Sequence, residues 1–263
     1  MSCFALVLGP WLIIRPSNDR NWQPDWAQTG RVEIRNDTVT FYNLRNFDYG
    51  LDGTKTERWQ TRIVNLSNIR GVDYFQDNFG GDLWAHPILS FDFGPDGYVA
   101  LSIETRREVG ESFSQFGGLY KMFELQYIFG DEADLIRVRT NIRREPVYLY
   151  RSNLSVELAK QLFLDSVAAH NGLFENPRFY NVVSANCTTS LRTQTAAKNR
   201  NPLDKRLLFN GRLDELLYER NPLVSDVLPF HDLRAQALIN DVALNAHKDL
   251  KFSKRIREGR PGF

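Results

Sequence analysis

Residues 84–108 constrain the fold of this chain more than any other stretch, because they predict a β-hairpin with two chemically different faces. The sequence G-P-D-G at residues 94–97 is typical of a tight turn, since proline restricts φ and glycine accepts a positive φ. A three-residue loop with a bulge at Gly97 pairs Gly94 with Tyr98 and sets the register of both strands.

In this register one face of the hairpin is wholly apolar, so we expect it to lie in the core. Its predicted cross-strand pairs are Leu89 with Ile103, Phe91 with Leu101, and Phe93 with Val99. The other face carries His86 and Glu104, which are diagonal neighbours because Ile88 is opposite Glu104. A histidine beside a carboxylate is a candidate general base with its orienting group. A two-residue loop would put Glu104 on the other face, and the consistent apolar face argues against it.

The composition is that of an ordinary globular protein. The chain has 263 residues, of which 42% are hydrophobic, with 33 basic and 32 acidic side chains. This length suits one large or two small domains, and the balanced charge does not indicate a nucleic-acid partner. The apolar run at residues 2–14 is too short to span a bilayer and lacks the basic start of a signal peptide. Two interpretations remain open: a trimmed membrane segment, or an element that docks on the core.

The remaining patterns predict an α+β fold, in which an antiparallel sheet of about five strands is flanked by helices. The predicted strands outside the hairpin are residues 31–34, 39–42, 59–65, 122–129, 135–142 and 147–150. Residues 122–129 and 135–142 are expected to form a second hairpin, whereas residues 69–79 show no clear period. Helical spacing begins after a Ser155 N-cap and runs to His170. We expect a second helix near Cys187, and further helices at residues 213–218 and 232–250.

Cys187 is the second chemical candidate, in the sequence A-N-C-T-T-S-L at a predicted helix start. Free N–H groups and the helix dipole lower the pKa of a thiol at such a position, and the Cys187 N–H is suited to an oxyanion. A thiol there and a histidine on a neighbouring strand match the papain-like arrangement. A buried, inert cysteine is an equally open interpretation, and for a single histidine a structural role is the commoner one.

Other side chains are secondary candidates. Ser102 and Asp92 are alternative orienting groups, and Ser102, Arg106, Tyr180 and Asn186 are the candidate substrate contacts. The arginines that suit an anionic head group, or simply a solvated sheet face, are Arg106, Arg137, Arg139, Arg143 and Arg144. The histidines and cysteines do not show the spacing of zinc ligands, and with only Cys3 and Cys187 a disulfide framework is not expected. We therefore expect neither a metal nor a cofactor.

Several runs together resemble the Lnb-type periplasmic domain, which is tied to a bacterial lipoprotein N-acyltransferase. They are W-A-H-P-I-L-S-F-D-F-G, L-S-I-E-T-R-R-E-V-G-E-S-F-S, G-G-L-Y-K-M-F-E-L-Q-Y-I-F-G-D-E-A-D-L-I-R-V-R-T-N-I-R, V-Y-L-Y and F-Y-N-V-V-S-A-N-C-T-T, preceded by N-L-R-N-F-D-Y-G. The resemblance covers residues 19–189. In its order of histidine then cysteine the family is similar to circularly permuted NlpC/P60-like thiol enzymes. Many relatives carry extra membrane helices, and this chain carries none complete.

The resemblance implies Cys187 as nucleophile, His86 as base and an orienting group, Glu104, on the adjacent strand. It also implies a periplasmic location, a phospholipid acyl donor, a lipoprotein acceptor and contact with a membrane surface at the outer face of the inner membrane. We expect residues 1–30 to be an apolar entry segment, 31–200 the permuted thiol-enzyme domain, and 201–263 a helical extension on it. An amidase or peptidase acting on cell-wall peptide is the alternative, and a non-catalytic binding module is the second.

Overall fold

The computed structural model describes residues 12–114, 116–182, 204–220, 223–224 and 228–263. Within them, the main sheet has eight strands in the order β1-β2-β9-β8-β7-β6-β10, and β5 pairs with β2 outside this order. The strands are β1 (Arg31–Arg35), β2 (Thr38–Arg45), β5 (Trp59–Asn65), β6 (Gly71–Gly80), β7 (Trp84–Asp92), β8 (Tyr98–Arg106), β9 (Glu124–Gly130) and β10 (Val147–Arg151). A separate pair is formed by β3 (Asp48–Tyr49) and β4 (Lys55–Thr56).

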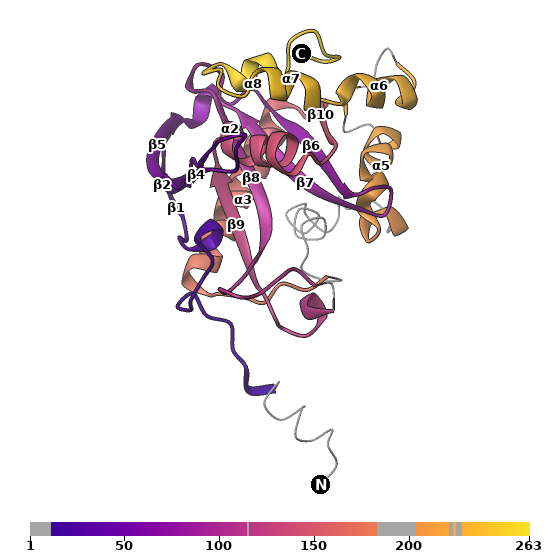
Figure 1. The fold of residues 1–263 in the computed structure, drawn as a ribbon. Helices are drawn as coiled ribbons and strands as arrows, with labels where there is room; N and C mark the ends of the chain where they lie inside the picture. Colours follow the sequence, from indigo (N-terminus) through magenta and orange to yellow (C-terminus); the bar gives the residue numbers. More distant parts are fainter. Residues whose placement is uncertain (1–11, 115, 183–203, 221–222, 225–227) are drawn as a thin grey trace.

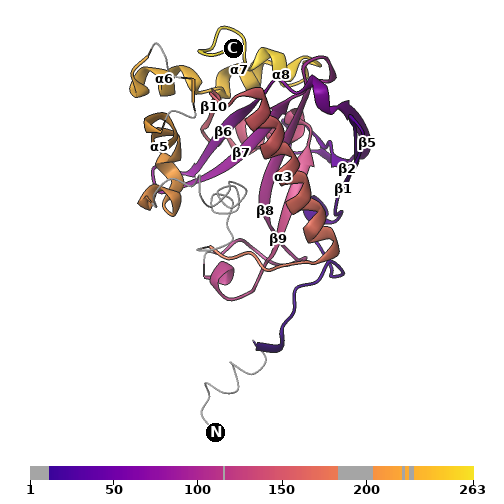
Figure 2. The same cartoon turned by 180° about the vertical axis from the view of Figure 1, so that it is seen from behind.

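Helices cover both faces of this sheet. They are α2 (Glu132–Leu135), α3 (Val156–Glu175), α5 (Leu213–Glu219), α6 (Phe230–Ala237), α7 (Asn240–Asn245) and α8 (Phe252–Arg255). Figure 2 shows α3 lying across one face, where Phe163 packs edge-on against Phe91 and Phe93. Helices α2, α7 and α8 pack on the other face around Phe75 and Ile88 (Figure 1). The sheet is thus the middle layer between two apolar cores.

The central hairpin is confirmed as β7 and β8, but its predicted register is wrong by two residues. Leu89 pairs with Leu101 and Phe91 with Val99, because the connecting loop is longer than predicted. The Asp96 carboxylate accepts hydrogen bonds from Asn65 N at 2.8 Å and Asn68 Nδ2 at 3.0 Å, and these distant contacts hold the wider loop. A shift of two residues leaves each side chain on its predicted face, so the apolar face is core as expected.

Most other predicted elements are also found. The strands predicted at residues 31–34, 39–42, 59–65 and 147–150 correspond to β1, β2, β5 and β10. Helix α3 begins after Ser155, whose hydroxyl accepts a hydrogen bond from Leu158 N. It continues past Asn171 to Glu175, because the Asn171 amide bonds both Val32 N and Val32 O rather than ending the helix.

The second predicted hairpin is wrong, because residues 132–143 are helical. Helix α2 leads into a six-residue π-helical segment, η5 (Val138–Arg143). The Asp131 side chain caps α2 by accepting a hydrogen bond from Ala133 N. This cap is a local helix signal, and it outweighs the short alternation of apolar and basic residues that follows.

The prediction of about five antiparallel strands was too low for this eight-stranded sheet, and β6 is the strand that the sequence pattern did not predict. All but the last two residues of this ten-residue strand are buried, so the alternation that marks a half-buried strand is absent. The sheet is mixed rather than purely antiparallel, since β2 and β9 meet in parallel at Arg45 and Gly130. The helix predicted at residues 232–250 is divided between α6 and α7.

Candidate active site

His86 and Glu104 come together on neighbouring strands of the central hairpin. The His86 Nε2 atom lies 2.7 Å from Ser102 Oγ and 3.4 Å from Glu104 Oε1. The Ser102 hydroxyl donates to Glu104 Oε1 at 2.6 Å, so Nε2–H of His86 donates to Ser102 Oγ. Because Nε2 carries the proton in this arrangement, Nδ1 is the nitrogen of His86 that can act as a base.

Arg139 connects this group to a second carboxylate. Its Nη2 atom lies 2.8 Å from Glu104 Oε1 and 3.3 Å from Ser102 Oγ, and its Nε is 3.1 Å from Asp77 Oδ2. Burial alone raises the pKa of Glu104, but the His86 charge and hydrogen bond, with Arg139 and Ser102, together hold that pKa well below its ordinary value. Glu104 is therefore a carboxylate near neutral pH and stabilises positive charge on His86.

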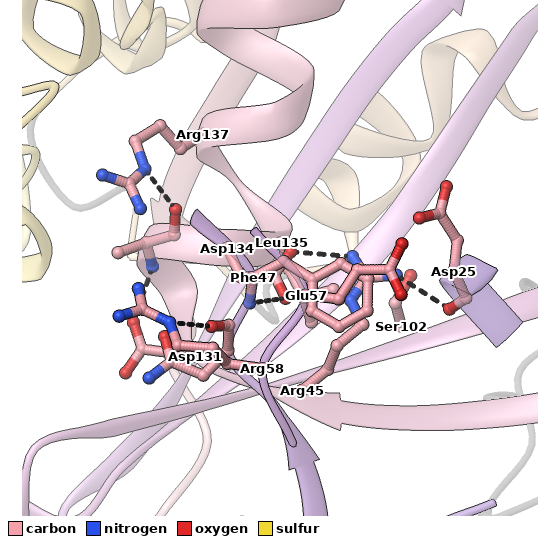
Figure 3. Close-up of polar contacts among 12 residues, drawn as sticks. Asp25, Arg45, Phe47, Glu57, Arg58, Ser102, Asp131, Asp134, Leu135 and Arg137 are labelled. Atoms are coloured by element: carbon pink, nitrogen blue, oxygen red, sulfur yellow. Dashed lines mark hydrogen bonds and ion pairs between the residues drawn. The ribbon is translucent and has the colours of Figure 1, made fainter. Parts of the chain in front are cut away.

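The position of Arg139 depends on how α2 is fixed to the sheet. Asp134 of α2 is fully buried, and its carboxylate takes a bidentate contact from Arg45 of β2 at 2.9 Å for each bond. It also accepts a hydrogen bond from Phe47 N at 2.8 Å; Figure 3 shows Arg45, Phe47 and Asp134 together. The following π-helical segment carries Arg139, and such segments are frequent at functional sites.

A cavity of about 390 Å³ opens beside this group. Its polar lining includes His86, Glu104, Asp77 and Glu145, and Tyr180 contributes to an apolar part of its wall. Burial, then the charge of Asp77, raises the pKa of Glu145 to about 7, although Arg143 and Arg139 oppose this shift. The cavity thus holds one carboxylate fixed as an anion and one that titrates near neutral pH.

Comparison with family models matches residues 55–214 to the Lnb N-terminal periplasmic domain. This match covers more than half of the chain. The chain belongs to the Lnb N-terminal periplasmic domain family. The comparison with curated proteins and the comparison with solved structures each gave no match. Family membership supports a periplasmic location and a role in the bacterial cell envelope.

Two of the predicted catalytic residues of this Lnb domain, His86 and Glu104, are brought together, and the third, Cys187, lies outside the described residues. Asn186, a predicted substrate contact, also lies outside them. Ser102 bridges the histidine and the carboxylate, a role that the sequence analysis gave it only as an alternative. Tyr180 lines the cavity.

Arg106 does not lie where a substrate contact was expected. Its guanidinium donates to the carbonyl oxygens of Trp26 and Ala27 and to Asn18 Oδ1, at 2.9 to 3.1 Å. The same group stacks on Trp22, with 4.2 Å between its central carbon and the ring centre. Arg106 therefore holds the N-terminal entry segment against β8.

Asp92 and two of the predicted anion-binding arginines also have structural roles. Asp92 accepts a hydrogen bond from Gly94 N and pairs with Arg151, away from His86. Arg137 pairs with Asp48, and Arg144 ends the π-helical segment in a left-handed conformation.

The other histidines lie outside the lining of this cavity. His170 is buried, its Nδ1 lies 3.0 Å from Tyr127 O, and burial lowers its pKa to about 4. His247 is buried, and its Nδ1 lies 2.9 Å from Asn141 Nδ2. Among the described residues there is no cluster of three or more metal-binding side chains. Within the same residues, none of the helices combines the length and apolar character needed to cross a bilayer.

Three charged residues of the cavity are not among the predicted site residues. Asp77 lies on β6, the strand that was not recognised, and Glu145 follows the segment that was mistaken for a strand. Arg107 follows β8 and was passed over in favour of Arg106. Recognition of β6 would have found Asp77, because antiparallel pairing with β7 places it directly opposite His86.

Proposed function

We propose that this Lnb domain is a thiol-dependent acyltransferase. It moves an acyl chain from a phospholipid, through a thioester on Cys187, to the N-terminal amine of a bacterial lipoprotein. The observation that carries this proposal is the contact chain from His86 through Ser102 to Glu104 at the cavity wall. Family membership is its second support, since the Lnb domain is tied to lipoprotein acylation by the resemblance described above.

The proposed reaction has two steps. In the first, Nδ1 of His86 takes the thiol proton of Cys187, and the thiolate attacks the ester carbonyl carbon. The C–O bond breaks, and the lysophospholipid alcohol leaves with the proton from His86. In the second step, the lipoprotein amine attacks the thioester and gives a proton to Nδ1 of His86, the C–S bond breaks, and the leaving thiolate takes that proton to restore the thiol. Glu104 keeps the ring of His86 oriented throughout and stabilises its protonated form.

The covalent chain limits how far Cys187 lies from the cavity. Val182 lines the cavity, and Cys187 is the fifth residue after it. Five residues of extended chain reach at most ~18 Å. This limit is compatible with the proposed transfer of a proton from Cys187 to His86.

Exposed apolar side chains near the cavity support contact with a lipid surface. In the connection between β8 and β9, Phe116 is 77% exposed to solvent. The other exposed apolar residues of this connection are Phe113, Leu119, Tyr120 and Met122. Phe113 lines the cavity as well. Several exposed apolar side chains in one connection are a feature of surfaces that contact membranes or partners.

The experiment is mass spectrometry of the intact protein after incubation with phospholipid vesicles. Wild type is expected to gain the mass of one acyl chain, and hydroxylamine is expected to remove it. Cys187→Ala is expected to gain none, whereas Cys3→Ala, the matched control, behaves as wild type. An unmodified wild-type protein, or the same added mass on Cys187→Ala, would refute the transferase.

An amidase or peptidase is the second candidate, and the charged part of the cavity wall favours it. Asp77, Glu104 and Glu145 are suited to hydrogen bonding with a peptide. This hydrolase is expected to release product from a cell-wall peptide and to accumulate no acyl-protein with phospholipid. The two functions are therefore separated by the same mass measurement with the two substrates.

A further inference from the structure

Arg107 is a cation that makes no ion pair with the other described residues. It lines the cavity of His86, and its central guanidinium carbon lies 4.0 Å from the centre of the Trp26 ring. Within the described residues its side chain makes no ion pair or hydrogen bond, and its Nε atom is buried without a partner. The stacking on Trp26 holds the guanidinium in place without using its N–H groups.

Arg143, at the end of the π-helical segment, is the second arginine of the cavity whose charge is not fully balanced by a carboxylate. Its side chain is 44% exposed, and its contact with Glu145 is long, at 3.9 Å between Nη1 and Oε2. Because the pKa of Glu145 is about 7, that carboxyl group is protonated in about half of the molecules at neutral pH. Glu145 therefore offsets only part of the charge of Arg143.

The third cavity arginine, Arg139, provides the contrast. It is almost fully buried, and both Glu104 and Asp77 pair with it. Burial lowers the pKa of Arg107, and the nearby charge of Arg143 lowers it further, although the carboxylates of Glu104, Asp25 and Glu111 oppose this shift. Two like charges at one cavity wall favour a bound anion, which would relieve their repulsion and satisfy their N–H groups.

The rest of the wall suits the apolar part of a ligand. It includes Phe113, Tyr180, Val182 and Leu208, and Phe79 adds a further ring. A ligand that combines an anionic group with acyl chains would therefore satisfy both parts of the lining. Arginine prefers the oxygens of phosphate, to which it donates two parallel hydrogen bonds.

We propose that Arg107 and Arg143 form a phosphate-binding subsite that holds the phosphodiester of an amphipathic ligand in the cavity of His86. Phosphate binding at these residues rests on the lining of the cavity and on its charges, not on the proposed function. That the bound phosphodiester belongs to the acyl donor rests on the proposed function. The ester of that donor then lies beside His86, and its acyl chains lie along the aromatic wall of the cavity.

The test is calorimetric titration with three probes on a Cys187→Ala background, which prevents turnover. The probes are dihexanoyl phosphatidylglycerol below its micelle concentration, dihexanoylglycerol, and inorganic phosphate. Arg107→Gln is expected to weaken binding of the phosphatidylglycerol at least tenfold and to leave binding of dihexanoylglycerol unchanged. Arg143→Gln, at a side chain that is 44% exposed, is expected to act in the same direction. Arg35→Gln, on an arginine whose side chain is 84% exposed on β1, is the matched control.

Three results would overturn the subsite. The first is that phosphatidylglycerol binds the control variant and both cavity variants with equal affinity. The second is that the cavity variants lose as much affinity for dihexanoylglycerol as for phosphatidylglycerol, which would show general damage to the cavity. The third is binding of inorganic phosphate with no binding of the lipid. Phosphatidylglycerol binding that depends on Arg107, together with no acyl mass on Cys187, would keep the subsite and refute the transferase.

Discussion

Replacing Glu104 with glutamine removes the charge beside His86 while keeping the shape of the side chain. The glutamine oxygen can still accept hydrogen bonds from Ser102 and Arg139, which bond Glu104 at 2.6 and 2.8 Å. The substitution therefore changes the electrostatics of the site more than its geometry. We expect it to reduce the reactivity of Cys187, since the thiolate is formed by transfer of its proton to His86.

The size of the effect follows from the separation of the two charges. Coulomb's law across the 3.4 Å between His86 Nε2 and Glu104 Oε1, with an effective dielectric constant of about 20, gives ~5 kcal/mol. Both side chains are about 15% exposed to solvent, and Arg139 lies against the same oxygen of Glu104. Because both effects weaken the attraction, we take about half of this energy, ~2–3 kcal/mol. This free energy corresponds to a decrease in thiolate population of roughly 30- to 150-fold.

The assay is the rate of alkylation by iodoacetamide at pH 7, with Cys3→Ala in every protein so that only Cys187 reacts. Glu157→Gln, on the exposed first turn of α3, is the matched control and is expected to react as wild type. Thermal unfolding followed by circular dichroism checks that each variant is folded. An alkylation rate for Glu104→Gln within threefold of wild type would refute the coupling between Glu104 and the thiol.

Two further predictions concern stability. Arg257→Met leaves Asp73 and Glu132 buried without the guanidinium that lies 2.6 to 2.9 Å from them, so we expect urea denaturation to show a loss of ~3–5 kcal/mol. Glu145, whose folded pKa is raised to about 7, keeps a proton that the unfolded chain releases near pH 4.5. Stability is therefore expected to fall as pH rises from about 4.5 to 7, by at most ~3 kcal/mol, and Glu145→Gln to flatten that dependence.

Each of these predictions has its own control. For Arg257→Met it is Arg255→Met, because Arg255 is half exposed and pairs with Glu258 at the surface, where loss of the pair costs less than ~1 kcal/mol. Equal losses in the two variants would mean that the buried ion pairs do not anchor the C-terminal helices. For Glu145, a curve between pH 4.5 and 7 that is the same in wild type and Glu145→Gln would show that its carboxyl does not keep a proton on folding.

The central hairpin shows how much could be predicted from local pattern. Its apolar face, its turn and the approach of His86 to Glu104 all follow from alternation and from the G-P-D-G turn. Its register did not follow, because the loop is held open by Asn65 and Asn68, which are distant in sequence. The predicted faces of the hairpin are nevertheless correct, because the register differs by an even number of residues. A shift by an odd number would have placed His86 and Glu104 on opposite faces.

The sequence by itself determined the α+β class, the strands with one buried face, helix α3 after its Ser155 cap, and the pairing of His86 with Glu104. These features depend on alternation, capping and turn chemistry, all of which act between residues close in the chain. The tertiary structure decided the rest. Strand β6 is buried on both faces and shows no period, and Arg139 reaches Glu104 and Asp77 only because Asp134 fixes α2 to Arg45. Such contacts join segments far apart in sequence, and their geometry exists only after the layers have packed.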